Sequence, residues 1–245
     1  DMDGGKMSEL PFAKKSLGQH WLTDAASLQT MCDAAEVTKD DVVLEIGPGY
    51  GTLTEYLVQR AAKVVAVEFD NQLAQTLTKN LQNHQNLLSR VQPWKEGKDG
   101  VIGNLTVVIQ DILKFDFTSL PPGYKVVANI PYYLTSNLIR VLSETPNAPS
   151  LAVLLVQKEV AERVAAVPGD MSLLSVTAQF YWQAGVGNVV PAALFTPPPK
   201  VDSQILMLER RSAPLFADVD TKELFRLVKA GFSERRKMLR SSLAG

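Results

Sequence analysis

Short apolar runs alternate with helical patterns through the first two-thirds of the chain, and this alternation limits the fold more than any other feature. It predicts buried strands at 42–46, 63–67, 105–109, 124–128 and 151–156, and helices at 52–60, 71–83, 134–142 and 158–166. Such βαβ units form a parallel sheet covered by helices, so the fold class is α/β. Residues 92–104 carry Pro, Trp, Lys and three glycines, and they predict an exposed loop.

The pattern changes after about residue 191. The run 196–199 (T-P-P-P) predicts a rigid extended segment, and 204–208 predicts a last strand. Two short helices are expected at 221–231 and 233–243. We therefore expect a flexible N-terminal segment (1–11), an α/β domain (12–195) and a small, mostly helical C-terminal domain (196–245).

Composition excludes several classes of protein. The 245 residues can form a full core, and 46% hydrophobic with 21% charged residues is ordinary for a globular chain. The 25 basic and 26 acidic residues exclude a generally basic nucleic-acid binder, though not a local basic patch. A single cysteine, Cys32, cannot form an internal disulfide, and no apolar run approaches the roughly 20 residues of a membrane span. We expect a cytoplasmic protein that does not enter the membrane.

A glycine-rich turn, 45–51 (E-I-G-P-G-Y-G), follows the first strand and opens a helix. Glycines let a ligand approach the backbone closely, and a helix N-terminus offers free N–H groups. Glu68 ends the next strand, at the spacing of a carboxylate that accepts ribose hydroxyls. A plain tight turn and a solvated strand end remain the alternatives. Taken together, these features predict a nucleotide-type cofactor.

The spacing within the turn bears on which cofactor binds. A dinucleotide fingerprint has the form G-x-G-x-x-G, whereas Gly47, Gly49 and Gly51 have the form G-x-G-x-G. Glu45 would repel a pyrophosphate but would suit the ammonium group of a methionine moiety. The turn, with Gly47 and Gly49 as contacts, therefore favours S-adenosylmethionine (SAM) over NAD.

A second constellation, 129–133 (N-I-P-Y-Y), follows the strand at 124–128. Polar and aromatic residues at the carboxyl edge of a parallel sheet lie where ligands bind in such folds. A loop with a capping Asn and a packed Tyr is the alternative. The segment resembles the N-x-P-Y motif of SAM-dependent methyltransferases that act on the exocyclic amines of bases.

The resemblance extends over roughly residues 12–243. Segment 15–22 (K-S-L-G-Q-H-W-L) resembles the K-x-x-G-Q-[NH]-[FW]-L segment of the KsgA-type ribosomal RNA adenine dimethyltransferases. Segments 157–160, 174–176, 195–203 (F-T-P-P-P-K-V-D-S) and 232–243 also match that family, in its order. The chain departs from it at 169–172, where the family usually has an aromatic residue. The related Erm enzymes usually carry looser versions of the last two segments.

The resemblance implies a class I SAM-dependent methyltransferase fold, with a mostly parallel seven-stranded sheet and a small helical C-terminal domain. It implies N6,N6-dimethylation of two adjacent adenines near the 3′ end of small-subunit (16S-type) rRNA, within an immature ribosomal subunit, by a monomer. One alternative is an Erm-type methyltransferase of 23S rRNA that confers macrolide resistance. Another is a non-catalytic assembly or nucleic-acid-binding factor.

The chemistry assigns roles at the second constellation. The adenine amine is a poor nucleophile, because its lone pair is delocalised into the ring. Acceptors at the Asn129 side chain and the Ile130 carbonyl would grip its two N–H groups, and Pro131 would fix their direction. Tyr132 would stack on the target base, and Phe195 could cover its second face.

The resemblance adds contacts to the cofactor. It implies that Asp111 accepts from the adenine amino group of SAM, the alternative being an N-cap for the following turn. It also implies that His20 and Leu22 close over the methionine end, with Asn129 nearby. No metal site is expected, because the two histidines, His20 and His84, are isolated.

A basic patch lies near the C-terminus. It comprises Lys229, Arg235, Arg236, Lys237 and Arg240. Such a run is commonly a solvated helix face. In a nearly neutral chain with a base-modifying motif, contact with RNA phosphates is the better interpretation.

Overall fold

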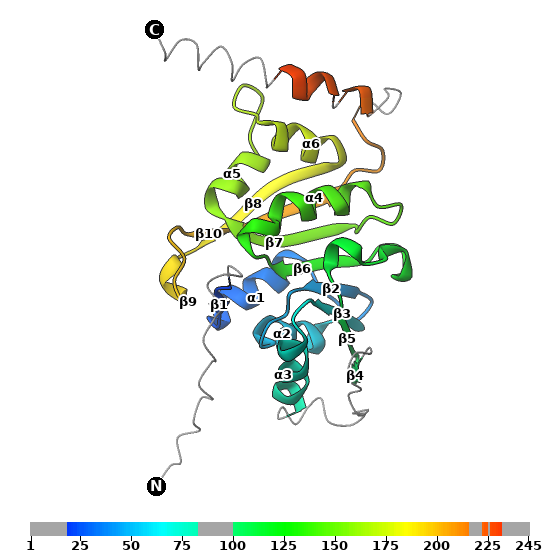
Figure 1. Cartoon of the computed structure of the whole chain (residues 1–245), viewed down its shortest axis with the longest axis vertical. Coiled ribbons are helices and arrows are strands. Elements are labelled where there is room, and N and C mark those ends of the chain that lie inside the picture. The colour runs from blue at the N-terminus through cyan, green and yellow to red at the C-terminus, as the bar shows by residue number, and fades with distance from the viewer. Residues whose placement is uncertain (1–18, 83–99, 216–221, 225, 232–245) are drawn as a thin grey trace.

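The computed structural model describes residues 19–82, 100–215, 222–224 and 226–231. Eight strands form the main sheet, in the order β4-β5-β3-β2-β6-β7-β10-β8 (Figure 1). They are β2 (Val42–Ile46), β3 (Lys63–Glu68), β4 (Gly100–Ile102), β5 (Leu105–Ile109), β6 (Lys125–Asn129), β7 (Leu151–Gln157), β8 (Trp182–Val190) and β10 (Ser203–Arg210).

Strands β2, β3, β5, β6 and β7 pair in parallel, whereas β10 pairs antiparallel with β7 and β8. Strand β4 is a three-residue addition at the edge, antiparallel to β5. The predicted α/β class with a mostly parallel sheet is confirmed, and the seven strands other than β4 form the expected seven-stranded sheet.

Helices cover both faces of this sheet. Helices α1 (Ala25–Ala34), α2 (Thr52–Arg60) and α3 (Asn71–Gln82) share one buried apolar cluster with the sheet. Helices α4 (Thr135–Glu144), α5 (Lys158–Val164) and α6 (Leu173–Tyr181) share the other. Alternate residues of β2 point into the two clusters, Val43 into the first and Leu44 into the second. A sheet buried on both faces explains why its strands are apolar throughout.

A short second sheet joins two distant parts of the chain. Strand β1 (Trp21–Leu22) pairs antiparallel with β9 (Phe195–Thr196), so that Trp21 faces Thr196 and Leu22 faces Phe195. The N-terminal segment is thereby held against the segment that carries the Pro-rich run.

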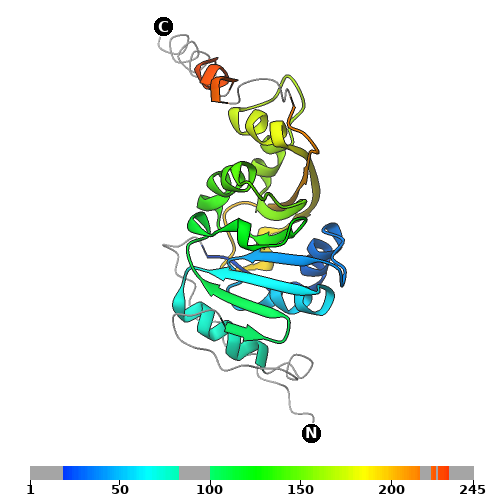
Figure 2. The same ribbon diagram turned by 90° about the vertical axis from the view of Figure 1, so that its right-hand side faces the viewer.

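Strand β10 lies inside the main sheet, although the expected boundary between 195 and 196 places it in the C-terminal domain. Ser203 pairs with Gln157 of β7 on one side and Val190 of β8 on the other. We therefore propose that the C-terminal unit begins after Arg210. Residues 222–224 and 226–231 are helical, in agreement with the helix expected there, and lie beyond the β8 end of the sheet (Figure 2).

Three further elements differ from the expectations. Residues 100–102 form β4, so the prediction of a loop across 92–104 is wrong at that point. Neither β8 nor α6 was predicted. The expected flexible segment 1–11, the helix at 233–243 and His84 lie outside the described residues. No helix in the described part of the chain is long and apolar enough to cross a membrane.

Candidate cofactor and target site

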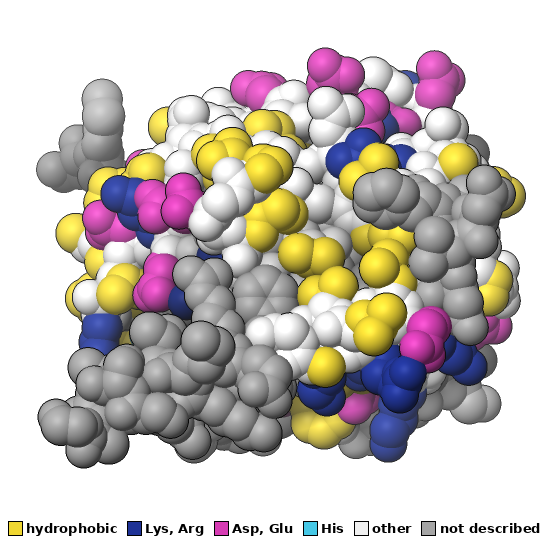
Figure 3. Space-filling model, turned by 90° about the horizontal axis from the view of Figure 1, so that it is seen from above, with side chains coloured by type: hydrophobic (Ala, Val, Ile, Leu, Met, Phe, Trp, Pro, Cys, Tyr) yellow, Lys and Arg dark blue, Asp and Glu magenta, His cyan; other side chains and the backbone are white. Residues whose placement is uncertain are grey.

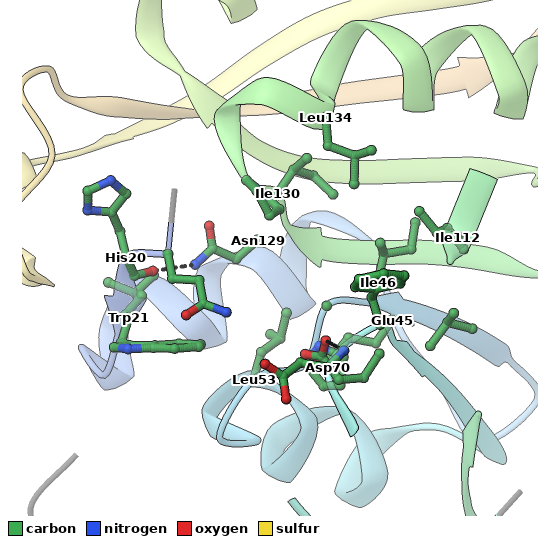
Figure 4. A pocket seen from close by; sticks show the side chains of 18 of the residues that line it. His20, Trp21, Glu45, Ile46, Leu53, Asp70, Ile112, Asn129, Ile130 and Leu134 are labelled. Carbon is green, nitrogen blue, oxygen red and sulfur yellow. Dashed lines mark hydrogen bonds between the residues drawn. The ribbon is translucent and has the colours of Figure 1, made fainter. Parts of the chain in front are cut away.

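A cavity of about 340 Å³ opens at the carboxyl ends of β2, β3, β5 and β6 (Figure 4). The chain runs outward from β2 through β3 to β5, then returns to β6 on the other side of β2. Such a reversal of strand order is the usual ligand site of open α/β sheets. The cavity brings together all but Gly49 of the residues expected at the cofactor and the target base: His20, Leu22, Glu45, Gly47, Glu68, Asp111, Asn129, Ile130, Pro131, Tyr132 and Phe195.

The glycine turn needs glycine for its backbone conformation. Gly47, Gly49 and Gly51 have φ of +62°, +57° and +85°, in the left-handed region. A Cβ at Gly47 would meet no atom within 4 Å, so this residue leaves open space in the cavity wall. A Cβ at Gly49 would collide with the Trp21 ring. Gly49 is not among the cavity-lining residues and instead permits close packing of Trp21.

Carboxyl groups set the electrostatics of this side of the cavity. Glu45, Glu68, Asp70 and Asp111 line it, and no Lys or Arg does so among the described residues. Glu45 is 2% exposed and accepts a hydrogen bond from the Thr54 hydroxyl. Burial raises the pKa of Glu45 to about 8, although the Thr54 hydrogen bond acts in the opposite direction. An acidic cavity of this kind suits a cation and disfavours the pyrophosphate of a dinucleotide.

Glu68 ends β3 as predicted and turns back over the glycine turn. Its Oε1 accepts from the Gly49 N–H at 3.3 Å, and its Oε2 accepts from the Asp70 N–H at 2.9 Å. Burial raises the pKa of Glu68, and these two N–H groups limit the rise. The carboxylate is thus anchored at the cavity wall where a ribose is expected.

Asp111 serves as an N-cap, which was the alternative to its cofactor role. Its Oδ1 accepts from the Leu113 N–H at 3.0 Å at the start of the 3-10 helix Ile112–Lys114. The same residue lines the cavity, so the cap holds the carboxylate at the position expected for the adenine contact. That contact stays a prediction.

Asn129 is the last residue of β6 and faces the opposite side of the cavity. Its amide Nδ2 donates to the His20 backbone oxygen at 3.5 Å, which turns Oδ1 away from His20 (Figure 4). The Ile130 N–H donates to the Leu155 oxygen at 3.1 Å, and this bond holds the backbone of the N-I-P-Y segment against β7. Because Nδ2 is the amide atom that bonds His20, Oδ1 of Asn129 can accept a hydrogen bond from a bound molecule.

Tyr132 is half-buried and makes two contacts. Its hydroxyl lies 2.6 Å from Ser203 Oγ, and its ring stacks on the His20 ring at a centroid distance of 5.9 Å. Phe195 lines the cavity but is only 3% exposed and belongs to the apolar core. His20, expected at the cofactor, is the stacking neighbour of Tyr132 that the sequence did not reveal.

We call the surface around Glu45, Gly47, Glu68 and Asp111 the cofactor half of the cavity. The surface around His20, Asn129, Tyr132 and Phe195 is the target half. Sequence reasoning missed Thr54, which bonds Glu45, and assigned no role to Ser203, which bonds Tyr132. The position of Ser203 at the end of the 195–203 segment could have indicated a role for it. For Thr54, the sequence offered only its position in the helix that follows the glycine turn.

Of the basic patch, only Lys229 lies among the described residues, and it is exposed on the helix beyond the β8 end of the sheet. Arg235, Arg236, Lys237 and Arg240 lie outside them. Seen from above, the largest group of basic side chains lies at the lower right, several acidic ones lie along the top edge, and both kinds are mixed at the left (Figure 3). In the described part of the chain, no three His, Cys, Asp or Glu residues are grouped to hold a metal ion.

Comparison with known proteins identifies the family. A family model described as "Ribosomal RNA adenine dimethylase" matches residues 12–245. The chain belongs to the ribosomal RNA adenine dimethylase family. "Ribosomal RNA small subunit methyltransferase A" of Streptococcus gordonii is 40% identical over 239 residues, which cover 94% of this chain and 76% of that protein. The protein of the same name from Dehalococcoides mccartyi is 38% identical over 235 residues, 95% of this chain and 75% of the relative.

Solved structures agree with this family assignment. A dimethyladenosine transferase from Plasmodium falciparum has a TM-score of 0.70 at 29% identity, covering 86% of this chain and 70% of the other. The 23S rRNA methyltransferase ErmE has a TM-score of 0.66 at 31% identity, covering 84% and 75%. The chain is thus an rRNA methyltransferase of the SAM-dependent type, with the class I fold.

The residues of the dimethylase cavity fit SAM. Open space at Gly47, carboxyl groups at Glu45 and Glu68 and the lack of a lining cation among described residues match a ligand that carries a sulfonium and an ammonium. When bound, SAM supplies a methyl group on a positively charged sulfur.

Proposed function

We propose that this chain dimethylates the N6 amino groups of two adjacent adenines near the 3′ end of small-subunit rRNA, within an immature subunit in the cytoplasm. The observation that carries the proposal is the placement of Asn129, Ile130, Pro131 and Tyr132 across the cavity from the acidic cofactor half. The names of the relatives support the choice of the small subunit.

The target half can activate an exocyclic amine. Asn129 Oδ1 and the Ile130 carbonyl would accept the two N–H groups of the adenine amine and turn its lone pair toward the cofactor half. Tyr132 offers the base an aromatic surface, since the base must leave its stack to enter the cavity. Pro131, whose carbonyl accepts from the Leu134 N–H at 2.9 Å, keeps the turn rigid. Catalysis is then mainly orientation of the amine for in-line attack.

The residues of the cofactor half would bind SAM, the methyl donor, and take no part in a covalent step. With SAM bound, Glu45 would pair with a cationic group, Glu68 would accept from the ribose hydroxyls, and Asp111 would accept from the adenine amino group of SAM. His20, at the border with the target half, and Leu22 would enclose the methionine end of SAM. In the target half, Phe195 would close the apolar wall beside the target base. Lys229, Arg235, Arg236, Lys237 and Arg240 would position the RNA through its phosphates without reading its sequence. One monomer carries all of these groups.

Methyl transfer from labelled SAM tests the proposal, with unmethylated small subunits, large subunits and naked rRNA as acceptors and with the product nucleoside identified. We expect dimethyladenosine on the small subunit. Labelling of large-subunit RNA would instead indicate the Erm-type activity. SAM binding without transfer to any acceptor would indicate a non-catalytic assembly factor.

A further inference from the structure

Tyr132 is fixed by contacts from two segments that are far from it in the sequence. Ser203 Oγ lies 2.6 Å from its hydroxyl, and the His20 ring stacks on its ring with an angle of 29° between the planes. The next residue, Tyr133, is 67% exposed although it also lines the cavity. The two adjacent tyrosines thus differ in how firmly the protein holds them.

Ser203 is built into the sheet. It is the first residue of β10, 1% exposed, and its backbone pairs with both neighbouring strands. Its hydroxyl therefore has a fixed position, set by β7 and β8 rather than by a loop. A buried hydroxyl that loses its partner destabilises the folded protein, because its hydrogen bonds to water are not replaced. The part-buried Tyr132 hydroxyl is the hydrogen-bond partner of this buried serine, so the pair favours one orientation of the ring.

His20 contacts two of the residues proposed to hold the target base, Asn129 and Tyr132. Its ring stacks on Tyr132, and its backbone oxygen accepts from the Asn129 amide (Figure 4). The ring is itself held, because Nδ1 lies 2.7 Å from the Pro197 oxygen. The adjoining β1–β9 pairing keeps the two segments in register.

We infer that Ser203 and His20 are positioning residues for the target adenine. Ser203 fixes the hydroxyl end of Tyr132, and His20 fixes one face of its ring together with the amide of Asn129. The target half is then already ordered before RNA binds, with the other face of Tyr132 left for the base. This inference rests on the proposed function, because the orientation of Tyr132 matters only when a base enters the cavity.

A double-mutant cycle tests the Ser203 arm. S203A and Y132F each remove one partner of the same hydrogen bond, and the ring remains in both variants. We expect each to lower kcat about tenfold on small subunits, with the SAM Kd within about twofold of wild type. The double variant should be no slower than the slower single variant, because both changes remove one interaction.

The matched control is S143A. Ser143 is also a buried serine, 2% exposed, and accepts a hydrogen bond from Trp182 Nε1 at 2.8 Å, outside the cavity. It should lower the thermal midpoint as S203A does and leave kcat unchanged. A kcat for S203A within twofold of wild type, or losses that multiply in the double variant, would overturn the inference. If S203A does not fold, S203C supplies a near-isosteric side chain with a weak donor, and the same loss of kcat is expected.

Two variants test the His20 arm. H20F keeps an aromatic ring against Tyr132 but loses the bond to Pro197, whereas H20A loses both the ring and the bond. We expect H20A to lower kcat more than H20F. Equal kcat values in the two variants would show that the His20 ring does not position Tyr132. Failure of the proposed function is separable: wild-type protein would then transfer no methyl to small subunits, whereas failure of this inference alone leaves wild type active and the variants unimpaired.

Discussion

The two halves of the cavity are built in different ways. The cofactor half comes from the ends of neighbouring parallel strands and the turns that follow them: Glu45 near the end of β2, Gly47 after β2, Glu68 at the end of β3 and Asp111 after β5. The target half joins β1, the end of β6, β9 and the start of β10, so that His20 contacts Pro197. One half depends on local βαβ geometry, and the other depends on contacts between distant segments.

The difference also appears in what each half holds in place. In the cofactor half, backbone N–H groups and the Thr54 hydroxyl satisfy carboxylates. In the target half, side chains and carbonyls from distant segments orient an amide and an aromatic ring. We therefore expect substitutions in the two halves to separate donor binding from methyl transfer.

The largest expected effect is that of N129A. Loss of the Oδ1 acceptor should lower kcat at least about a hundredfold, while SAM binding stays within about tenfold of wild type. Single-turnover transfer to small subunits and a SAM titration measure the two quantities. Turnover near that of wild type would show that the amide does not hold the target amine, and the division into halves would fail at this residue.

Gly49→Ala should mainly weaken SAM binding, in contrast to N129A, which should mainly lower kcat. The φ of +57° at Gly49 disfavours any side chain, and the Cβ would collide with Trp21. We expect SAM affinity to fall about tenfold or more and the free energy of unfolding to fall by about 1–3 kcal/mol. The control is G123A, at φ +83° with no atom within 4 Å of its Cβ, which adds backbone strain without a collision. Equal SAM affinities in the two variants would contradict this account.

A pH-dependent effect is expected at Glu45. Its pKa is raised by burial from 4.5 to about 8 in the folded protein, so folding takes up a proton between these values. The contribution of Glu45 to the free energy of unfolding is therefore complete below about pH 4.5, and it is lost as the pH rises through 8. Urea unfolding of the SAM-free protein should therefore show E45Q gaining on wild type from pH 5.5 to 8.5, and parallel pH profiles would contradict the raised pKa.

SAM binding should also change the protonation of Glu45. A cation beside Glu45 favours the ionised carboxyl, so SAM binding at pH 7 should release protons from wild type and fewer from E45Q. Calorimetric titrations in two buffers of different ionisation enthalpy measure the number released. Equal release from both proteins would place the ammonium of SAM away from Glu45.

The smallest expected effect concerns the C-terminal cations. Arg236→Ala with Lys237→Ala should weaken RNA binding and reduce the slope of log K against log salt by about 0.7–0.9 for each phosphate that the protein no longer neutralises. The control is K39A, an exposed lysine that precedes β2 and so lies away from the carboxyl edge. An unchanged slope in the double variant would indicate that these two cations only face solvent and do not contact RNA phosphates.

Most of the parallel sheet could be predicted from the sequence, because strands buried on both faces are apolar throughout. Strand β8 could not, since Gly185, Gly187 and Asn188 interrupt its pattern. Pairing with β10 stabilises β8 in spite of these residues. Gly187 leaves room for Ile205, whose Cβ would lie only 3.2 Å from a Cβ added at Gly187. Helix α6 was missed because apolar residues surround most of its circumference, so it lacks a clear helical period.

In the candidate site, too, some residues could be predicted from the sequence and others could not. The positions of Glu45, Gly47 and Glu68 at or just beyond strand ends allowed their prediction, because successive βαβ units bring the carboxyl ends of parallel strands to one edge. Spacing could not predict that Ser203 meets Tyr132 or that Asn129 meets His20. Those contacts depend on antiparallel pairing between segments far apart in the chain, and only the family resemblance indicated that the segments belong together.

The position of β10 has a consequence for biosynthesis. It is the last strand of the main sheet in chain order, yet it lies between β7 and β8, so the sheet stays open until residue 210 has left the translating ribosome. The strand ends that hold the donor can fold earlier, as the N-terminal part emerges. A nascent chain could therefore shape its donor pocket well before Ser203 arrives to complete the place for the acceptor base.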